Sequence, residues 1–243
     1  MVAIVTPFKD GEVDQEALRR LVRFHLEFGT HGIVPCGTTG EGATLSYEET
    51  RLVGEIVLEE TAGRVPVILG TGKNSTSQTI AMTRLAKEIG AQGALVVTPY
   101  YNKPTQEGLY QHFLTVAEAV DIPIILYNVP GRTSVNLEAE TVIRLSEIGN
   151  IVAVKEASGD LVQISEIISM CSDAIDVLSG DDFLVLPILA IGGSGVISVV
   201  ANIVPRKMAA LCNYFNDGEF AGAKSLHYQL LPLCRAMFFE TNP

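Results

Sequence analysis

The sequence predicts an α/β protein of the (β/α)₈ TIM-barrel class with a truncated C-terminal helical extension. Short apolar segments alternate with amphipathic helical patterns along the 243 residues. The apolar segments start every 20 to 34 residues, which is the period of one strand–helix unit. Eight such units in roughly 200 residues fit a closed barrel better than an open sheet. A doubly wound open sheet is the alternative.

The predicted strands are short and apolar, as is typical of parallel strands that are covered on both faces. They span residues 2–8, 32–37, 66–72, 93–99, 123–129, 151–158, 175–181 and 195–200. A helix is predicted after each strand, at residues 15–28, 47–61, 75–90, 106–120, 137–148, 161–171, 183–191 and 205–216.

Residues at the predicted helix ends support this assignment. Ser46, with a glutamate three residues later, is typical of a capping box. Asp14 and Ser75 suit the N-cap position, and Pro205 suits the first turn of a helix. Gly90 stands where a helix C-cap is expected.

The chain shows no linker of low complexity before about residue 217. Residues 1–216 are therefore predicted to form one barrel that is the catalytic domain. One more helical pattern follows at residues 218–239, with an expected interruption at Pro232. Residues 217–243 are interpreted as the start of a C-terminal helical region that is incomplete.

The composition indicates a globular, cytoplasmic protein. The formal net charge of −11 disfavours nucleic acid and anionic membranes as partners. No apolar run reaches the length of a membrane span, and the first residues read as a strand rather than as a signal peptide. The four cysteines have neither disulfide nor metal-type spacing, and the four histidines have no ligand partner, so no metal site is predicted.

Lys155 is the first candidate for chemistry. It lies near the C-terminal end of the predicted strand 151–158, where alternation places Ile151 on the same face and Val152 on the opposite face. Burial among apolar neighbours disfavours the charged ammonium and frees the amine to attack a carbonyl, as in Schiff-base chemistry. From this segment alone, a lysine whose amine merely reaches water is an open alternative.

In a barrel, functional groups lie at the C-terminal ends of the strands and in the loops that follow them. The glycine-rich loop 37–42 carries the hydroxyls of Thr38 and Thr39, which suit a carboxylate, although an ordinary tight turn is also consistent. Tyr127, at the end of the fifth strand, either points into the barrel or is a core tyrosine. Lys155, Tyr127 and Thr38 are thus predicted to converge at one end of the ring.

Five motifs at these strand ends resemble the dihydrodipicolinate synthase family, also called 4-hydroxy-tetrahydrodipicolinate synthases, among the class I pyruvate-dependent aldolases. The motifs are GTTGE at 37–41, TPYYN at 98–102, YNVPGRT at 127–133, VKEA at 154–157 and LSGDD at 178–182. The resemblance covers essentially the whole chain. It implies a lyase that condenses pyruvate with L-aspartate 4-semialdehyde in lysine and diaminopimelate biosynthesis.

The resemblance also implies roles for individual residues. Lys155 would form the imine with pyruvate, and Tyr127 would act as acid and base beside it. Thr38 would link Tyr127 to Tyr101, which would come from the neighbouring subunit. Arg132 would hold the carboxylate of the semialdehyde. The further substrate-binding residues that the resemblance implies are Thr39, Gly180 and Ile197. It implies no metal and no organic cofactor.

The resemblance implies a homodimer and, as a dimer of dimers, a homotetramer. Asn74 and Tyr100 match the allosteric lysine pocket of the family. Tyr47, Thr50 and Gln78 stand where lysine-sensitive members carry histidines and an acid, so weak or absent inhibition is expected. Against the family pattern, the chain is expected to start a few residues late and to stop before the usual C-terminus.

Two other functions stay open at this point. The nearest is a related lyase on the same scaffold, such as N-acetylneuraminate lyase or a 2-keto-3-deoxy sugar acid aldolase. Arg132 and the pair Tyr100–Tyr101 argue against it, because polyol substrates require hydroxyl-binding groups there. The more remote alternative is a catalytically inactive, ligand-binding relative, although every catalytic position of the motifs is filled.

Overall fold

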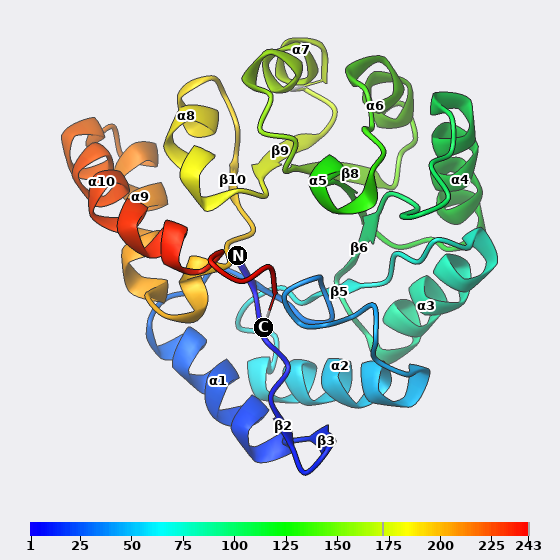
Figure 1. Cartoon of the computed structure of the whole chain (residues 1–243), viewed down its shortest axis with the longest axis horizontal. Coiled ribbons are helices and arrows are strands. Elements are labelled where there is room, and N and C mark those ends of the chain that lie inside the picture. The colour runs from blue at the N-terminus through cyan, green and yellow to red at the C-terminus, as the bar shows by residue number, and fades with distance from the viewer. Residues whose placement is uncertain (172, 243) are drawn as a thin grey trace.

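In the computed structural model, which describes residues 1–171 and 173–242, a ring of parallel strands is surrounded by helices (Figure 1). The strands of the ring are β1 (Val2–Ala3), β4 (Ile33–Val34), β5 (Ile68–Gly70), β6 (Gly93–Val97), β7 (Ile124–Asn128), β8 (Ile151–Glu156), β9 (Asp176–Ser179) and β10 (Gly195–Val196). Strands β5 to β10 form one continuous parallel sheet in chain order, and β1 pairs in parallel with β4.

Two isolated parallel bridges close the ring. Val2 pairs with Ser198, just after β10, and Ile33 pairs with Val67, just before β5. The pair β1–β4 therefore connects the two edges of the six-stranded sheet. The predicted barrel is confirmed, and the alternative of an open doubly wound sheet is wrong because no edge of the sheet is left free among these strands.

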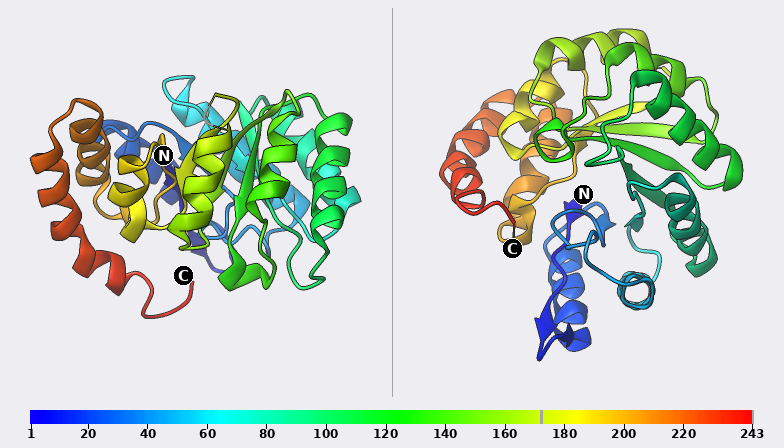
Figure 2. Two further views of the ribbon diagram at one scale, coloured as in Figure 1. Left: turned by 90° about the horizontal axis from the view of Figure 1, so that it is seen from above. Right: turned by 45° about the vertical axis from the view of Figure 1, so that its right-hand side comes forward.

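The longer helices lie outside the ring, as Figure 2 shows from two further directions, and the short helix Pro130–Thr133 lies over the strand ends. The helices are α1 (Gln15–Glu27), α2 (Tyr47–Thr61), α3 (Thr76–Ile89), α4 (Gln106–Ala119), α5 (Pro130–Thr133), α6 (Ala139–Ser146), α7 (Leu161–Cys171), α8 (Val185–Ala190), α9 (Pro205–Asn216) and α10 (Phe220–Ala236), with 3₁₀ turns at Asp182–Leu184 and Val200–Asn202. Among the described residues, no helix combines the length and apolar character that a membrane crossing requires.

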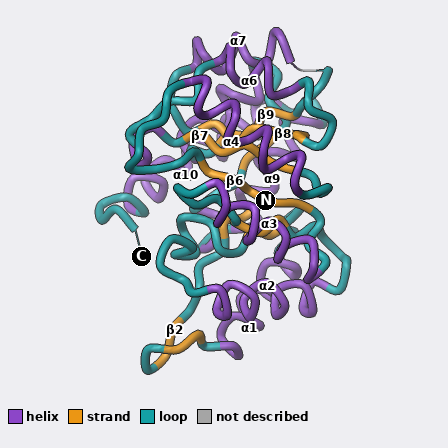
Figure 3. The backbone as a smooth tube through the Cα atoms, turned by 90° about the vertical axis from the view of Figure 1, so that its right-hand side faces the viewer, coloured by secondary structure: helices purple, strands orange, loops and turns teal. Residues whose placement is uncertain are grey.

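The strands are shorter than predicted, because only part of each apolar segment joins the ladder. The first predicted strand, 2–8, divides into β1 and into β2 (Phe8–Lys9), which forms an antiparallel hairpin with β3 (Glu12–Val13). This hairpin projects away from the barrel beside α1 (Figure 3). The predicted helix 183–191 likewise begins with a 3₁₀ turn before α8.

The cap residues behave largely as predicted. The side chain of Asp14 accepts a hydrogen bond from the amide of Ala17, and Ser46 forms both bonds of a capping box. Gly90 ends α3 in the left-handed conformation, with φ of 88°. Ser75 occupies the N-cap of α3 without capping it, because its hydroxyl bonds to the hydroxyl of Ser77 instead.

The expected interruption at Pro232 is wrong. Helix α10 continues through this proline to Ala236. Proline removes one backbone N–H, but α10 packs along α9 and buries Leu230 and Cys234 on that side. Packing on both sides of the proline stabilises the helix more than the lost hydrogen bond weakens it.

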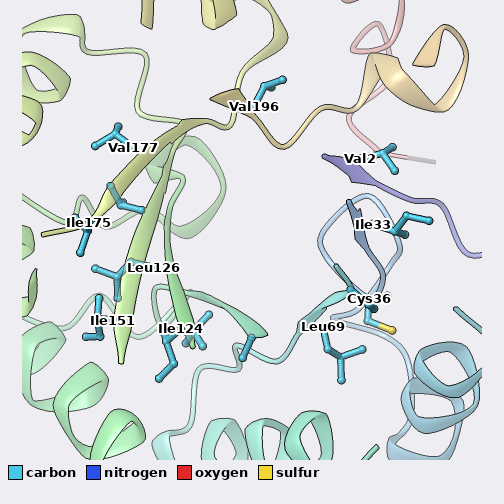
Figure 4. Packing of buried hydrophobic residues seen from close by; sticks show 14 of the residues in the cluster. Val2, Ile33, Cys36, Leu69, Ile124, Leu126, Ile151, Ile175, Val177 and Val196 are labelled. Atoms are coloured by element: carbon cyan, nitrogen blue, oxygen red, sulfur yellow. The ribbon is translucent and has the colours of Figure 1, made fainter. Parts of the chain in front are cut away.

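The apolar core has two layers on either side of the strands. The inner layer fills the barrel and consists of Ala3, Val34, Ile68, Leu95, Ile125, Tyr127, Val129, Ala153, Leu178 and Ile197. The outer layer lies between the strands and the helices, where Leu126, Val177 and Val196 point away from the barrel axis (Figure 4). Side chains alternate between these layers along each strand, as the pleat requires.

One strand departs from this alternation. The pairing of β7 with β8 joins Ile124 to Ile151 and then Ile125 to Ala153, so Val152 is an extra residue in β8. This bulge turns Ile151 into the outer layer and leaves Val152 38% exposed. The prediction that Ile151 shares a face with Lys155 is therefore wrong, as is the prediction of a fully buried strand.

Two histidines are buried behind the barrel. Nδ1 of His25 on α1 lies 3.1 Å from the hydroxyl of Thr30, and Nδ1 of His112 on α4 lies 2.9 Å from that of Thr76. Burial lowers the pKa of each imidazole from 6.5 to about 4. The pKa of each histidine is lower in the folded than in the unfolded protein. The stability that comes from burying the neutral imidazoles is therefore complete above pH 6.5 and is lost as the pH falls toward 4.

We predict that His112→Gln reduces the sensitivity of folding to acid. Between pH 6.5 and 5, each buried histidine should remove about 2 kcal/mol of unfolding free energy, because one pKa unit corresponds to about 1.36 kcal/mol. Urea denaturation at pH 7 and pH 5 measures this loss, which should be smaller in the variant by about the share of one histidine. Equal losses in variant and wild type would contradict the prediction.

Candidate active site

Neighbouring strands place Tyr127 and Lys155 side by side. The register of β7 on β8 pairs these two residues directly, and both side chains point into the barrel. Tyr127 is 6% exposed and Lys155 is 4% exposed. The Lys155 ammonium nitrogen lies 4.0 Å from the centre of the Tyr127 ring. The structure thus brings together the predicted nucleophile and the predicted acid–base residue.

A cavity of about 540 Å³ opens in front of this pair at the C-terminal ends of the strands. Its lining includes Thr38, Thr39, Tyr127, Arg132, Lys155 and Gly180. A Cβ atom at Gly180 would lie 3.0 Å from Cε of Lys155, so glycine leaves room for the lysine side chain. The predicted site residues from four strand ends, those of β4, β7, β8 and β9, therefore meet in one chamber.

The loop that carries Thr38 and Thr39 is held in a narrow space. Cys36, at its start, adopts the left-handed conformation with φ of 57°. A side chain at either Gly42 or Gly70 would collide with the carbonyl group of Cys36, so only glycine permits this close packing. This packing holds the backbone of the loop against the end of β5.

The implied relay through Thr38 is not formed within one chain. In the described part of the chain, no hydrogen bond joins the hydroxyls of Thr38 and Tyr127, and Tyr101 is 88% exposed. Tyr101 also holds a left-handed backbone, with φ of 74°. A second cavity of about 370 Å³, lined by Thr38, Tyr127 and Tyr100, lies beside the chamber.

Arg132 lies on the short helix α5 at the rim of both cavities. Its Nη2 atom donates a hydrogen bond of 2.6 Å to the carbonyl of Thr241. The side chain of Asn242 donates to the carbonyl of Thr38 at 3.1 Å. The segment after α10 thus returns to the middle of the ring, as Figure 1 shows, and forms part of the chamber wall.

Asp181 is an acidic residue of the chamber that the sequence reasoning did not single out. Asp181 lines the wall, accepts a hydrogen bond of 2.9 Å from the amide of Phe183, and has its pKa raised by burial. It lies two residues after the end of β9, so the strand-end rule that selected Lys155 would have found it. In the described residues, Lys155 itself has no carboxylate at ion-pair distance.

Besides Tyr101, three predicted residues lie outside the chamber. Ile197 is buried in the inner apolar layer. Asn74 is half-buried, and its carbonyl accepts a hydrogen bond from the side chain of Asn102. Tyr100 lines only the second cavity. Among residues 1–171 and 173–242, no cluster of histidine, cysteine, aspartate and glutamate suits a metal ion.

The chain is similar to known proteins over its whole length. The model described as the dihydrodipicolinate synthetase family matches residues 1–243. A 4-hydroxy-tetrahydrodipicolinate synthase of Syntrophobacter fumaroxidans is 59% identical over 243 residues, covering 100% of this chain and 84% of that protein.

Solved structures agree with this similarity. The crystal structure of dihydrodipicolinate synthase from Aquifex aeolicus is 52% identical, has a TM-score of 0.97, and matches 100% of this chain and 83% of its own. The dihydrodipicolinate synthase from Acinetobacter baumannii, described as chloride-inhibited and complexed with pyruvate, is 48% identical with a TM-score of 0.97, over 100% of this chain and 84% of its own.

The fold and the chamber define the class first: a (β/α)₈-barrel lyase with a buried lysine at the C-terminal end of a strand. Within this class, the chain belongs to the dihydrodipicolinate synthetase family. The resemblance of the five motifs is thereby confirmed.

Proposed function

We propose that this enzyme condenses pyruvate with L-aspartate 4-semialdehyde to give 4-hydroxy-tetrahydrodipicolinate, in lysine and diaminopimelate biosynthesis. The observation that carries the proposal is the buried Lys155 amine, 4.0 Å from the ring centre of Tyr127 in a chamber with hydroxyl and guanidinium groups. The high identity to synthases of this name supports the same conclusion.

In the proposed mechanism, the Lys155 amine attacks the keto carbon of pyruvate, and loss of water gives an imine. The imine nitrogen accepts electrons when a proton leaves the pyruvate methyl group, which produces an enamine. The enamine carbon then forms the new bond to the aldehyde carbon of the second substrate, whose oxygen takes up a proton. The amino group of the second substrate then attacks the imine carbon, which closes the ring and releases the Lys155 amine. No metal or organic cofactor is needed for these steps, because the protonated imine is the electron acceptor.

Tyr127 is the proposed acid and base for these proton transfers. The ring centre of Tyr127 lies 4.0 Å from the Lys155 nitrogen, so this tyrosine is beside the position of the imine. A phenol gives up its proton reluctantly at neutral pH, so a hydrogen-bonded relay is required. Thr38 and Tyr101 are the proposed relay, and Thr38 and Thr39 are also proposed to bind the pyruvate carboxylate.

Pyruvate and borohydride test the imine directly. We predict that they add one reduced pyruvate per chain and that peptide mass spectrometry finds it on Lys155. Borohydride without pyruvate is the control and should add nothing. Label on a different lysine, or retained label in Lys155→Ala, would exclude the proposed nucleophile.

Arg132 is the proposed partner of the semialdehyde carboxylate, since a guanidinium binds a carboxylate through two parallel hydrogen bonds. We predict that Arg132→Ala lowers kcat/KM for the semialdehyde by roughly 10- to 100-fold, which corresponds to a lost charge-assisted pair of about 1.5–3 kcal/mol. The KM for pyruvate should change little. Arg132→Lys, which keeps the charge without the paired geometry, should lie in between.

The outcome that contradicts this assignment is a selective rise in the KM for pyruvate.

A coupled assay with sugar acids in place of the semialdehyde would identify a related lyase instead.

A homodimer is the proposed active assembly, and a tetramer of two dimers is the proposed larger form. The exposed Tyr101 side chain and its left-handed backbone suit a residue that reaches out of its own subunit. The second cavity beside Thr38 and Tyr127 offers it a place in a partner. In a twofold dimer this exchange would be reciprocal.

Mixing two inactive variants tests the shared site. After dissociation and reassociation of Lys155→Ala with Tyr101→Phe, one site in each hybrid dimer carries both lesions and the other carries none. Random pairing makes about half of the dimers hybrid, so we predict recovery of roughly a quarter of the sites. Hybrid dimers that native mass spectrometry detects but that remain inactive would show that Tyr101 serves its own subunit.

The proposal also covers regulation by lysine and the limits of the catalytic domain. Asn74 and Tyr100 are the candidate allosteric residues, with weak or absent inhibition by lysine. The catalytic barrel is proposed to span residues 1–216, and residues 217–243 are proposed to belong to a C-terminal helical region. A biosynthetic enzyme of this kind is proposed to work in the cytoplasm.

A further inference from the structure

A buried carboxylate lies directly behind the candidate active site. Glu156 and Asn128 follow Lys155 and Tyr127 in their strands and are paired in the same register of β7 on β8. Side chains alternate, so these two point outward to the helices while Lys155 and Tyr127 point inward. Glu156 is 1% exposed, and Asn128 is fully buried.

Neutral donors surround the Glu156 carboxylate. The side-chain amide of Asn128 donates to both of its oxygens, at 3.1 and 3.2 Å. The backbone amide of Ser158 donates at 2.8 Å, and the side chain of Gln163 on α7 donates at 3.1 Å. In the residues that the structure describes, no lysine, arginine or histidine lies at ion-pair distance.

Such an arrangement is costly in stability. Burial raises the pKa of Glu156, although its hydrogen bonds act in the opposite direction. An apolar pair of similar volume would avoid the desolvation of a carboxylate. Hydrogen bonds, however, fix both distance and direction, which apolar contacts do not. The network therefore supplies geometry rather than stability.

Asn128 extends this geometry to the loop that carries Arg132. Its side-chain oxygen accepts a hydrogen bond of 2.9 Å from the amide of Leu137, and its amide donates to the side chain of Asn136 at 2.8 Å. These bonds join the two ends of the loop 128–137, which includes α5 and Arg132. One side chain thus contacts the Glu156 strand and closes the Arg132 loop.

We infer that Glu156 and Asn128 are positioning residues, which hold Lys155, Tyr127 and Arg132 in their relative places from the outer face of the barrel. This inference rests on the proposed function, because it assigns the three positioned residues to one reaction. Neither Glu156 nor Asn128 lines the chamber, so both act only through the residues that they orient.

The test begins with Glu156→Gln, which keeps the shape and introduces a donor. The new amide faces the donor groups of Gln163 and Asn128, so the strand end must shift. We expect kcat to fall roughly 10- to 100-fold, as is typical of a small misplacement of reacting groups. Glu166→Gln, the same change on the exposed face of α7, is the matched control and should keep wild-type kcat.

Two further variants separate the effect of geometry on kcat from the effects of charge and of stability. In Glu156→Gln with Gln163→Glu, the carboxylate moves to the other end of the same hydrogen bond, so we expect at least a tenfold recovery of kcat. Ile164→Val, a buried change on α7 outside the network, supplies a variant with lower thermal stability and intact hydrogen bonds.

The outcome is decided by the rate at which borohydride traps pyruvate on Lys155 and by the pH profile of that rate. Both are measured at a temperature well below the unfolding temperature of every variant. In Glu156→Gln we expect slower trapping and a shifted profile, with recovery in the double variant. The inference would be overturned if Glu156→Gln kept the wild-type trapping rate and pH profile, or if its trapping rate fell no further than that of Ile164→Val. Failure of wild-type protein to label Lys155 would instead overturn the proposed function.

Discussion

The parallel ladder between β7 and β8 is the constraint on which the rest of the site depends. Five residue pairs join these strands, and the last two pairs place Tyr127 beside Lys155 and Asn128 beside Glu156. A shift by one residue would exchange the inner and outer faces of a strand, so this register decides which side chains point into the chamber. The bulge at Val152 precedes these pairs and leaves their alternation intact.

The sequence was sufficient for the order of elements and for much of the site. The spacing of apolar segments predicted the barrel, and the strand-end rule selected Lys155, Tyr127 and Thr38, which the structure places together. Local signals failed where tertiary packing decides the result. A bulge at Val152 and a helix that continues through Pro232 both depend on neighbours that no local pattern encodes.

The rest of the chamber wall depends on contacts between distant residues. Arg132 meets Thr241 across 109 residues, and Thr38 meets Asn242 across 204 residues. Periodicity and capping carry no information about such pairs. The burial of Glu156 is a related case, because its motif was recognised but a glutamate after a lysine reads as a solvated strand end until the helices that cover it are known.

Closure of the ring is uneven around its circumference. Strands β1 and β4 are joined by two residue pairs. One parallel bridge joins β1 to Ser198 after β10, and one joins β4 to Val67 before β5. Local opening of a folded protein costs least where hydrogen bonds and contacts are few. Amide hydrogen exchange would therefore be faster along this seam than in β7 and β8. The threonine loop follows β4, so we expect the side of the chamber that is proposed to bind a substrate carboxylate to open more readily than the side that carries the lysine.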